Sequence, residues 1–129
     1  MQRIVVIDDE PGIRRTLEAV LTRAGYQVRL ASNGSEGVAL CRDSVPHLVI
    51  TDLHMPQADG FEAIVALRAL DPKLPIIAIS GGDETARLQL LGSSELLGVV
   101  SSLKKPFTVR EILDAVRAAI GSHRQGKEA

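Results

Sequence analysis

The stretch LVITDLHMPQADG, residues 48–60, joins an apolar run to an acid and then to a turn. Leu48–Ile50 is apolar without interruption, which is typical of a strand buried on both faces. Asp52 stands at the end of this run, and Pro56 soon afterwards indicates that the strand has stopped. The stretch therefore predicts a buried strand of a parallel sheet with a carboxylate at its carboxyl end.

Apolar runs of the same kind recur along the chain and predict five strands. They are RIVVI (3–7), YQVRL (26–30), HLVIT (47–51), PIIAI (75–79) and GVVSSL (98–103). Segments with a helical period separate and follow these runs. The predicted helices cover residues 11–24, 34–42, 61–70, 87–97 with an irregular extension, and 109–120, the last behind a capping box of Thr108 and Glu111.

Strands that alternate with helices predict an α/β fold with a parallel sheet. We expect a (βα)5 doubly wound five-stranded sheet with right-handed crossovers and helices on both faces. Residues 1–121 then form one domain, and residues 122–129 form a short polar tail that we expect to fray. Nine residues follow Ile120, so we expect no DNA-binding output domain within this sequence.

Composition excludes several classes of function. The 129 residues are 45% apolar and 24% charged with a net charge of −1, so a basic surface for nucleic acid is not expected. Tyr26, Phe61 and Phe107 are the only aromatic residues, too few for a base-stacking platform. The single Cys41 is expected to be a packed thiol. With no apolar run of about 20 residues and no signal-peptide pattern, we expect a cytoplasmic protein without membrane contact.

Polar and charged residues stand at the carboxyl ends of the predicted strands. In an open parallel sheet these ends meet at one edge, where ligands bind. The first, third, fourth and fifth strands contribute Asp8-Asp9-Glu10, Asp52, Ser80 and Lys104-Lys105, respectively. The sequence therefore predicts a cluster of carboxylates with a hydroxyl and an ammonium.

Such a cluster suits phosphoryl chemistry on a metal ion. Crowded carboxylates repel each other unless a cation neutralises them, and oxygen ligands favour a hard divalent ion, best Mg²⁺ with several waters. One carboxylate can then act as a nucleophile. An ammonium and a hydroxyl supply the stabilisation that a phosphoryl group needs.

Each residue also has a plainer explanation. An acid among Asp8, Asp9 and Glu10 could cap the helix that begins at Pro11, and Lys105 could be a solvated surface charge. For single residues other than Asp52 the plain explanation is favoured. It fails for the set, because chance would have to place these groups at the ends of four different strands.

The motifs that carry this cluster resemble the receiver domain of two-component response regulators. IVVIDDEP, LVITDLHMPQADG, IIAIS and LKKPF match that family in order and spacing, and the resemblance covers roughly residues 3–120. It implies the flavodoxin-like strand order 2-1-3-4-5. It also implies a switch that accepts a phosphoryl group from a sensor histidine kinase or a histidine phosphotransfer protein and then changes its binding to an output partner.

The resemblance also assigns roles to single residues. Asp52 would be the phosphoacceptor, and Ser80 would be the switch hydroxyl. Lys105 would contact the phosphate, and its peptide bond to Pro106 would be cis. Mg²⁺ would be held by Asp9, Asp52 and the backbone carbonyl of His54, with Asp8 acting through a water. The side chain of His54 is predicted to tune phosphoryl lifetime.

One position departs from the family, and three alternatives stay open. Ser102 stands where receivers often carry an aromatic switch residue. The chain could be a receiver-like adaptor that acts without phosphorylation, the front of a longer regulator, or a phosphotransferase enzyme on a similar sheet, although the intact cluster and the lack of a substrate cap disfavour the first and the last. We expect no enzyme beyond the domain's part in its own phosphorylation and dephosphorylation. A homodimer through the fourth and fifth helices is left open.

Overall fold

The sheet has the predicted strand order. The computed structural model describes residues 2–53, 59–80 and 99–128. Its five strands are all parallel and lie in the order β2-β1-β3-β4-β5. Their bounds are β1 Arg3–Ile7, β2 Gln27–Ala31, β3 Leu48–Asp52, β4 Ile76–Ser80 and β5 Val99–Lys104. The doubly wound (βα)5 prediction is confirmed for the part of the chain that is described.

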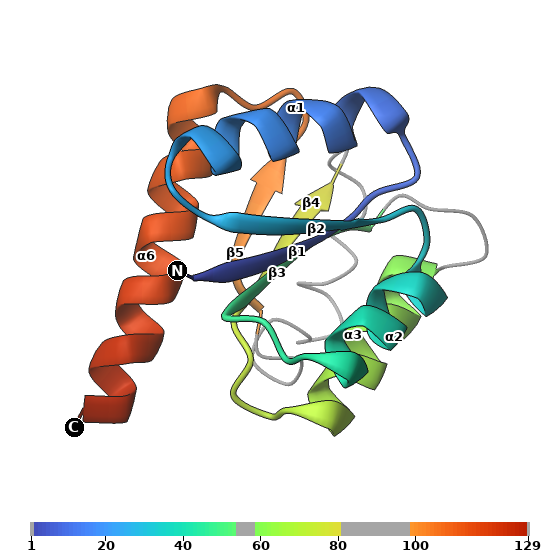
Figure 1. Ribbon diagram of the computed structural model, residues 1–129, viewed down its shortest axis with the longest axis vertical. Coiled ribbons are helices and arrows are strands. Elements are labelled where there is room, and N and C mark those ends of the chain that lie inside the picture. Colours follow the sequence, from blue (N-terminus) through green and yellow to red (C-terminus); the bar gives the residue numbers. More distant parts are fainter. Residues whose placement is uncertain (1, 54–58, 81–98, 129) are drawn as a thin grey trace.

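Helices cover both faces of this sheet, as Figure 1 shows. α1 (Pro11–Arg23) and α6 (Val109–Glu128) pack on one face, and α2 (Gly34–Asp43) and α3 (Asp59–Leu70) pack on the other. Two separate apolar cores result, one on each side of the sheet. The helix expected over residues 87–97 lies outside the described residues.

Alternation along β1 shows how the sheet feeds both cores. Val5 and Ile7 pack with α2 and α3, whereas Ile4 and Val6 pack with α1 and α6. Helix α2 approaches β1 very closely, because a Cβ at Gly37 would lie 2.3 Å from Cδ1 of Ile7. Glycine at this position therefore lets α2 sit directly on the strand that leads to Asp8.

Local signals fix most helix starts. The capping box before α6 is present, with the Glu111 amide donating to Thr108 Oγ1 at 3.0 Å and the Thr108 amide donating to Glu111 Oε1 at 2.9 Å. Asn33 caps α2 by accepting from the Glu36 amide at 2.8 Å. These hydrogen bonds satisfy backbone donors that the first helical turn leaves without partners.

The end of α6 corrects one expectation. The helix predicted over residues 109–120 is longer than expected, because it continues to Glu128. A Cβ at Gly121 would meet no atom within 4 Å, so this glycine marks neither a close packing contact nor a stop. The segment after it contains no proline, and its glutamine, lysine and glutamate are good helix formers.

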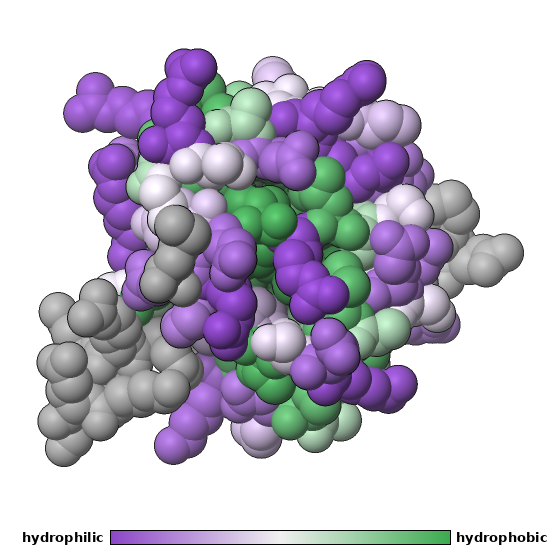
Figure 2. Space-filling view, in the orientation of Figure 1, coloured by the Kyte–Doolittle hydropathy of each residue, from purple (hydrophilic) through white to green (hydrophobic). Residues whose placement is uncertain are grey.

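The face of the molecule drawn in Figure 2 is mostly hydrophilic. In Figure 2 polar side chains cover most of the face seen, with apolar side chains visible near its centre, where the edge strand β2 runs in Figure 1. β2 is accordingly only partly buried, unlike β3 and β4. None of the described helices combines the length and the apolar character that a membrane crossing requires.

Candidate functional site

Four strands deliver polar side chains to one edge of the sheet. Asp8 follows β1, Asp52 ends β3, Ser80 ends β4, and Lys105 follows β5. The first three are fully or almost fully buried, with 0%, 1% and 0% of their surface exposed. Asp52 pairs in register with Ile79, and Ser80 with Lys104, so the four strand ends stand level. The predicted convergence at the carboxyl edge is confirmed.

The ammonium of Lys105 lies at the centre of the site. Its Nζ is 3.1 Å from Asp52 Oδ2 and 3.2 Å from Glu10 Oε1, and 3.8 Å from Asp8 Oδ2. The Lys105 amide donates to the Ser80 carbonyl at 2.8 Å, which fixes the backbone of the lysine against the end of β4. One cation therefore faces several carboxylates, and the local charge is strongly negative.

These charges hold Lys105 in its protonated form. Burial lowers the pKa of the lysine, but the hydrogen bond with Asp52 and the negative charges of Asp8 and Asp52 outweigh that effect. The pKa of Lys105 is consequently raised above its ordinary value. The side chain thus stays an ammonium at neutral pH, which is the form that can stabilise an anionic group.

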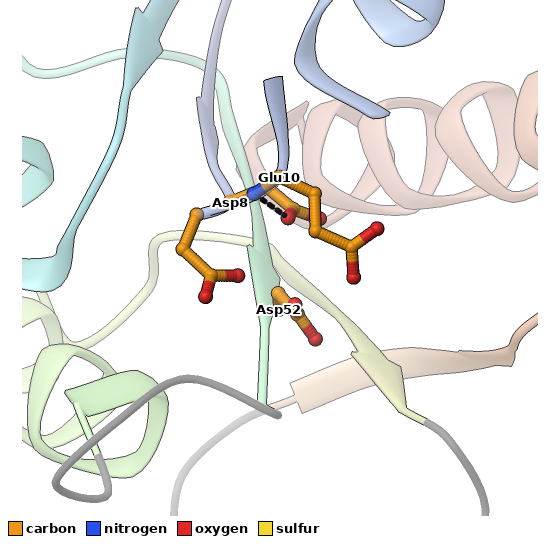
Figure 3. Close-up of side chains that lie close together, drawn as sticks. Asp8, Glu10 and Asp52 are labelled. Carbon is orange, nitrogen blue, oxygen red and sulfur yellow. Dashed lines mark hydrogen bonds between the residues drawn. The ribbon is translucent and has the colours of Figure 1, made fainter. Parts of the chain in front are cut away.

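Asp8 is a buried carboxylate with only one of its two oxygens in a hydrogen bond among the described residues. Its Oδ1 accepts from the Glu10 amide at 2.9 Å, drawn as the dashed line in Figure 3, whereas its Oδ2 has no hydrogen-bond partner among the described residues. Burial raises the pKa of Asp8 to about 6; the amide hydrogen bond opposes this shift, and the negative charge of Asp52 adds to it. This buried carboxylate oxygen therefore has a cation nearby, the Lys105 ammonium at 3.8 Å, but no hydrogen-bond donor.

The carboxylates could together hold a metal ion. Asp8, Asp9, Glu10 and Asp52 each offer an oxygen, and these atoms lie within 4.8 Å of one another. Figure 3 shows three of them, Asp8, Glu10 and Asp52, facing a common space at the ends of β1 and β3. An all-oxygen set with one unsatisfied buried atom fits a hard divalent cation such as Mg²⁺.

Most of the predicted site residues lie together. Asp8, Asp9 and Asp52 form the acidic cluster and Lys105 lies on it, while Lys104 is exposed, as strand alternation predicts. The Lys105-Pro106 peptide bond is cis, which confirms that expectation. His54, expected to give a backbone ligand and to tune lifetime, lies outside the described residues. The Ser102 backbone is part of β5, but its side chain is not described.

Two contacts were not anticipated from the sequence. Glu10 was considered only as one of three acids after the first strand, yet its carboxylate pairs with Lys105. Arg14 was not among the candidate site residues, yet its Nη1 donates to the Asp8 carbonyl at 2.7 Å. The available signals were the position of Glu10 directly before the helix and the position of Arg14 one turn further on, where a long side chain reaches back over the loop.

Similarity to known proteins points to the same site. A model of the response regulator receiver domain matches residues 4–117. The chain belongs to the response regulator receiver family. Members of this family are phosphorylation-controlled switches of two-component signalling. The predicted family and its flavodoxin-like fold are thereby confirmed.

This chain matches some relatives over nearly their full length and others over about half of it. It is 32% identical over 116 residues to sporulation initiation phosphotransferase F of Bacillus subtilis, covering 90% of this chain and 91% of that protein. It is 34% identical over 118 residues to response regulator MprA of Mycobacterium sp., covering 92% of this chain. The chain spans about half the length of MprA, 50%.

Solved receiver domains have the same fold. The receiver domain protein from Clostridium thermocellum superposes with a TM-score of 0.87 at 26% identity, over 97% of this chain and 98% of that one. Response regulator TrrA from Thermotoga maritima superposes with a TM-score of 0.80 at 29% identity, over 92% of this chain and 99% of that one. The TrrA structure is a complex with Mg²⁺-BeF.

Proposed function

We propose that this receiver domain accepts a phosphoryl group on Asp52. The observation that carries the proposal is the Asp52 carboxylate itself, which is 1% exposed at a strand end and lies 3.1 Å from the ammonium of Lys105. A buried acid with a fixed cation beside it can act as a nucleophile and can have the charge of its product stabilised. No other described acid combines burial of this degree with a cation at hydrogen-bond distance.

The reaction is a phosphoryl transfer from a phosphohistidine donor to the Asp52 acceptor. A carboxylate oxygen of Asp52 attacks phosphorus, and the bond from phosphorus to the imidazole nitrogen of a phosphohistidine breaks. The bonding electron pair stays on that nitrogen, which takes up a proton to leave a neutral histidine. The product is an aspartyl phosphate, a mixed anhydride. Lys105 then donates a hydrogen bond to a phosphate oxygen instead of to the carboxylate alone. Its positive charge thereby stabilises the negative charge on the phosphoryl group.

Asp9 and Asp52, with the His54 carbonyl, are proposed to hold Mg²⁺ directly, and Asp8 is proposed to act through a water. When bound, Mg²⁺ would neutralise the acidic cluster and the charge on the phosphoryl oxygens. The Oδ2 of Asp8, which accepts no hydrogen bond from the described residues, supports this assignment, because a bound water would donate one. Asp8 is ready for that role, since its other oxygen is held by the Glu10 amide.

Ser80 is proposed to report the phosphorylated state. It is buried at the end of β4, one strand from Asp52, and its carbonyl accepts from the Lys105 amide. A hydrogen bond donated by the Ser80 hydroxyl to the new phosphate would favour one arrangement of the segment after β4. That change would alter partner binding. With Ser102 in place of an aromatic residue, this hydroxyl is the proposed start of the signal.

The biological setting follows from the same proposal. A sensor histidine kinase or histidine phosphotransfer protein would supply the phosphoryl group in the cytoplasm. The domain would be a switch that takes part in its own phosphorylation and dephosphorylation, and not an enzyme with a separate substrate. Its output partner and any homodimer through the fourth and fifth helices are left to experiment.

Intact-mass spectrometry tests the proposal. The protein is incubated with acetyl phosphate and Mg²⁺, and we expect a mass gain of one phosphoryl group that is absent from Asp52→Asn. Asp43→Asn is the matched control, because Asp43 is an exposed residue at the end of α2 and not part of the acidic cluster, and it should gain the group like the wild type. No gain at any Mg²⁺ concentration would favour the adaptor instead, and continuous turnover of added phosphate esters would favour an enzyme.

A further inference from the structure

Glu10 directly precedes α1, and its side chain is not used to cap the helix. It is the N-cap residue in an extended conformation, with φ −91° and ψ 114°, and its side chain makes no capping hydrogen bond. Its amide instead donates to Asp8 Oδ1 at 2.9 Å, which fixes its backbone beside the acidic cluster. The carboxylate of Glu10 is thus available for another partner, and that partner is Lys105.

Lys105 divides its donors unevenly among the carboxylates. An ammonium has three N–H groups. Asp52 and Glu10 lie within hydrogen-bond distance of Nζ, at 3.1 Å and 3.2 Å, whereas Asp8 lies at 3.8 Å. The pair with Glu10 joins residues 95 positions apart in the sequence, so it ties the loop after β1 to the loop after β5.

Phosphorylation changes one of these two close contacts and spares the other. Asp52 loses its free carboxylate when it becomes an acyl phosphate, so Lys105 has to move its hydrogen bond from that carboxylate to the phosphate. Glu10 keeps its charge throughout. Its side chain is 57% exposed and that of Lys105 is 21% exposed, so the pair lies at the open side of the site, where a phosphoryl donor would arrive.

We propose that Glu10 is a positioning residue for phosphoryl transfer, holding the Lys105 ammonium beside Asp52 before and during the reaction. This inference rests on the proposed function of Asp52. Without Glu10, the long lysine side chain would have more conformations open to it, and fewer of them would place Nζ at the reacting group. Glu10 acts through Lys105 and does not touch the transferred group.

The test compares rates of phosphorylation by acetyl phosphate at saturating Mg²⁺. We expect Glu10→Ala to lower the rate about two- to fivefold, the range set by a partly exposed ion pair. Glu10→Gln should fall between the wild type and the alanine variant, because its amide oxygen still accepts from the ammonium. Glu18→Ala is the matched control, since Glu18 is an exposed glutamate of the same helix, and its rate should equal that of the wild type.

A double-mutant cycle separates positioning from a direct effect. In a Lys105→Ala background, removal of Glu10 should have no further effect on the rate. The same factor in both backgrounds would overturn the inference, because Glu10 would then act on something other than Lys105. A rate for Glu10→Ala at or above that of the wild type would overturn it as well.

A structural measurement needs no reaction. In ¹H–¹⁵N spectra of the lysine ammonium groups of the Mg²⁺-free protein, the Lys105 protons should exchange faster with water in Glu10→Ala than in the wild type or in Glu18→Ala. An unchanged Lys105 signal would contradict the inference. If the wild type takes up no phosphoryl group, or if Asp52→Asn still does, the proposed function of Asp52 fails; the spectra then still decide whether Glu10 holds the lysine.

Discussion

The two ends of the central strands β1 and β3 are built in different ways. At the amino end, the Arg3 amide donates to His47 Nδ1 at 2.9 Å, and the His47 amide donates to the Arg3 carbonyl at 2.8 Å. The Arg3 guanidinium donates to the Val45 carbonyl at 3.0 Å. At the carboxyl end, a cluster of four acids faces the ammonium of Lys105. Hydrogen bonds between Arg3, Val45 and His47 join the strands at the amino end, whereas the carboxyl end carries an excess of negative charge.

Each end also leaves one buried side-chain atom without a hydrogen bond among the described residues. At the amino end it is Arg3 Nε, whose guanidinium still donates through another nitrogen. At the carboxyl end it is Asp8 Oδ2, an atom that shares the negative charge of a buried carboxylate. The amino end therefore stabilises the sheet, whereas the carboxyl end keeps a destabilising charge that a cation or a proton can relieve.

The largest expected effect concerns Asp8. Its folded-state pKa of about 6 lies above the ordinary 3.8, so the native state binds the proton more tightly than the unfolded state. The resulting stability is fully present below pH 3.8 and is lost as pH rises through 6. Above pH 6, where this stability has been lost, we expect the Asp8 charge to cost the Mg²⁺-free protein on the order of 2–3 kcal/mol.

Urea unfolding without divalent cations measures this cost. The stability of Asp8→Asn relative to the wild type should grow as pH rises from 5 to 7.5. Asp43→Asn should show no such growth, since Asp43 is exposed and only loosely paired with Arg29, at 3.8 Å. Parallel pH profiles for the wild type and Asp8→Asn would show that the carboxyl end holds no unfavourable charge.

Gly37→Ala tests whether the body of the sheet supports the charged end. The new Cβ would meet Ile7, the residue before Asp8, so α2 or Ile7 has to shift; we expect a loss of about 1–2 kcal/mol in the free energy of unfolding. Gly12→Ala is the matched control, because nothing lies within 4 Å of its Cβ, and it should be neutral or stabilising. Equal effects from both substitutions in thermal unfolding would contradict the close contact of α2 with β1.

Magnesium should stabilise the charged end. At a concentration ten times its dissociation constant, Mg²⁺ should raise the free energy of unfolding by about 1.4 kcal/mol. The gain should be smaller in Asp8→Asn, which has one negative charge less, and unchanged in His47→Ala at the opposite end. Equal gains in Asp8→Asn and the wild type, measured by urea unfolding, would place the cation away from the acidic cluster.

His47→Ala sharpens the comparison from the amino end. It removes the acceptor of the Arg3 amide and should cost about 1 kcal/mol of stability. Because the amino end carries no reacting group, the rate of phosphorylation by acetyl phosphate should stay at the wild-type value. A lower rate in the folded variant would show that the two ends are coupled.

The sequence predicted the fold well because its apolar runs and its capping signals agree. Four of the five strands nevertheless begin and end one residue later than the runs do, as in β3 and β4. Asp52 and Ser80 are polar, yet both remain paired in the sheet ladder, opposite Ile79 and Lys104. Hydropathy cannot register a buried polar residue whose backbone completes a strand.

The site was predictable to the level of which strand ends meet. The hydrogen bond from the Lys105 ammonium to Glu10 was not predictable, because the two residues are 95 positions apart and no local sequence pattern pairs them. The extension of α6 to Glu128 was missed for a different reason: the helix was predicted only as far as its apolar stripe, which ends at Ile120, and a polar segment can continue a helix without such a stripe.

The central claim is that Asp52 carries the phosphoryl group, and chemical trapping tests it most directly. After reaction with acetyl phosphate and Mg²⁺, borohydride reduces an aspartyl phosphate to homoserine in two steps. A first hydride adds at the acyl carbon and phosphate leaves to give the aldehyde; a second hydride reduces the aldehyde, whose oxygen takes a proton from water. Peptide mass spectrometry should find homoserine at position 52 and aspartate unchanged at positions 8 and 9. Homoserine at another position, or none in a protein that has gained a phosphoryl mass, would contradict the account.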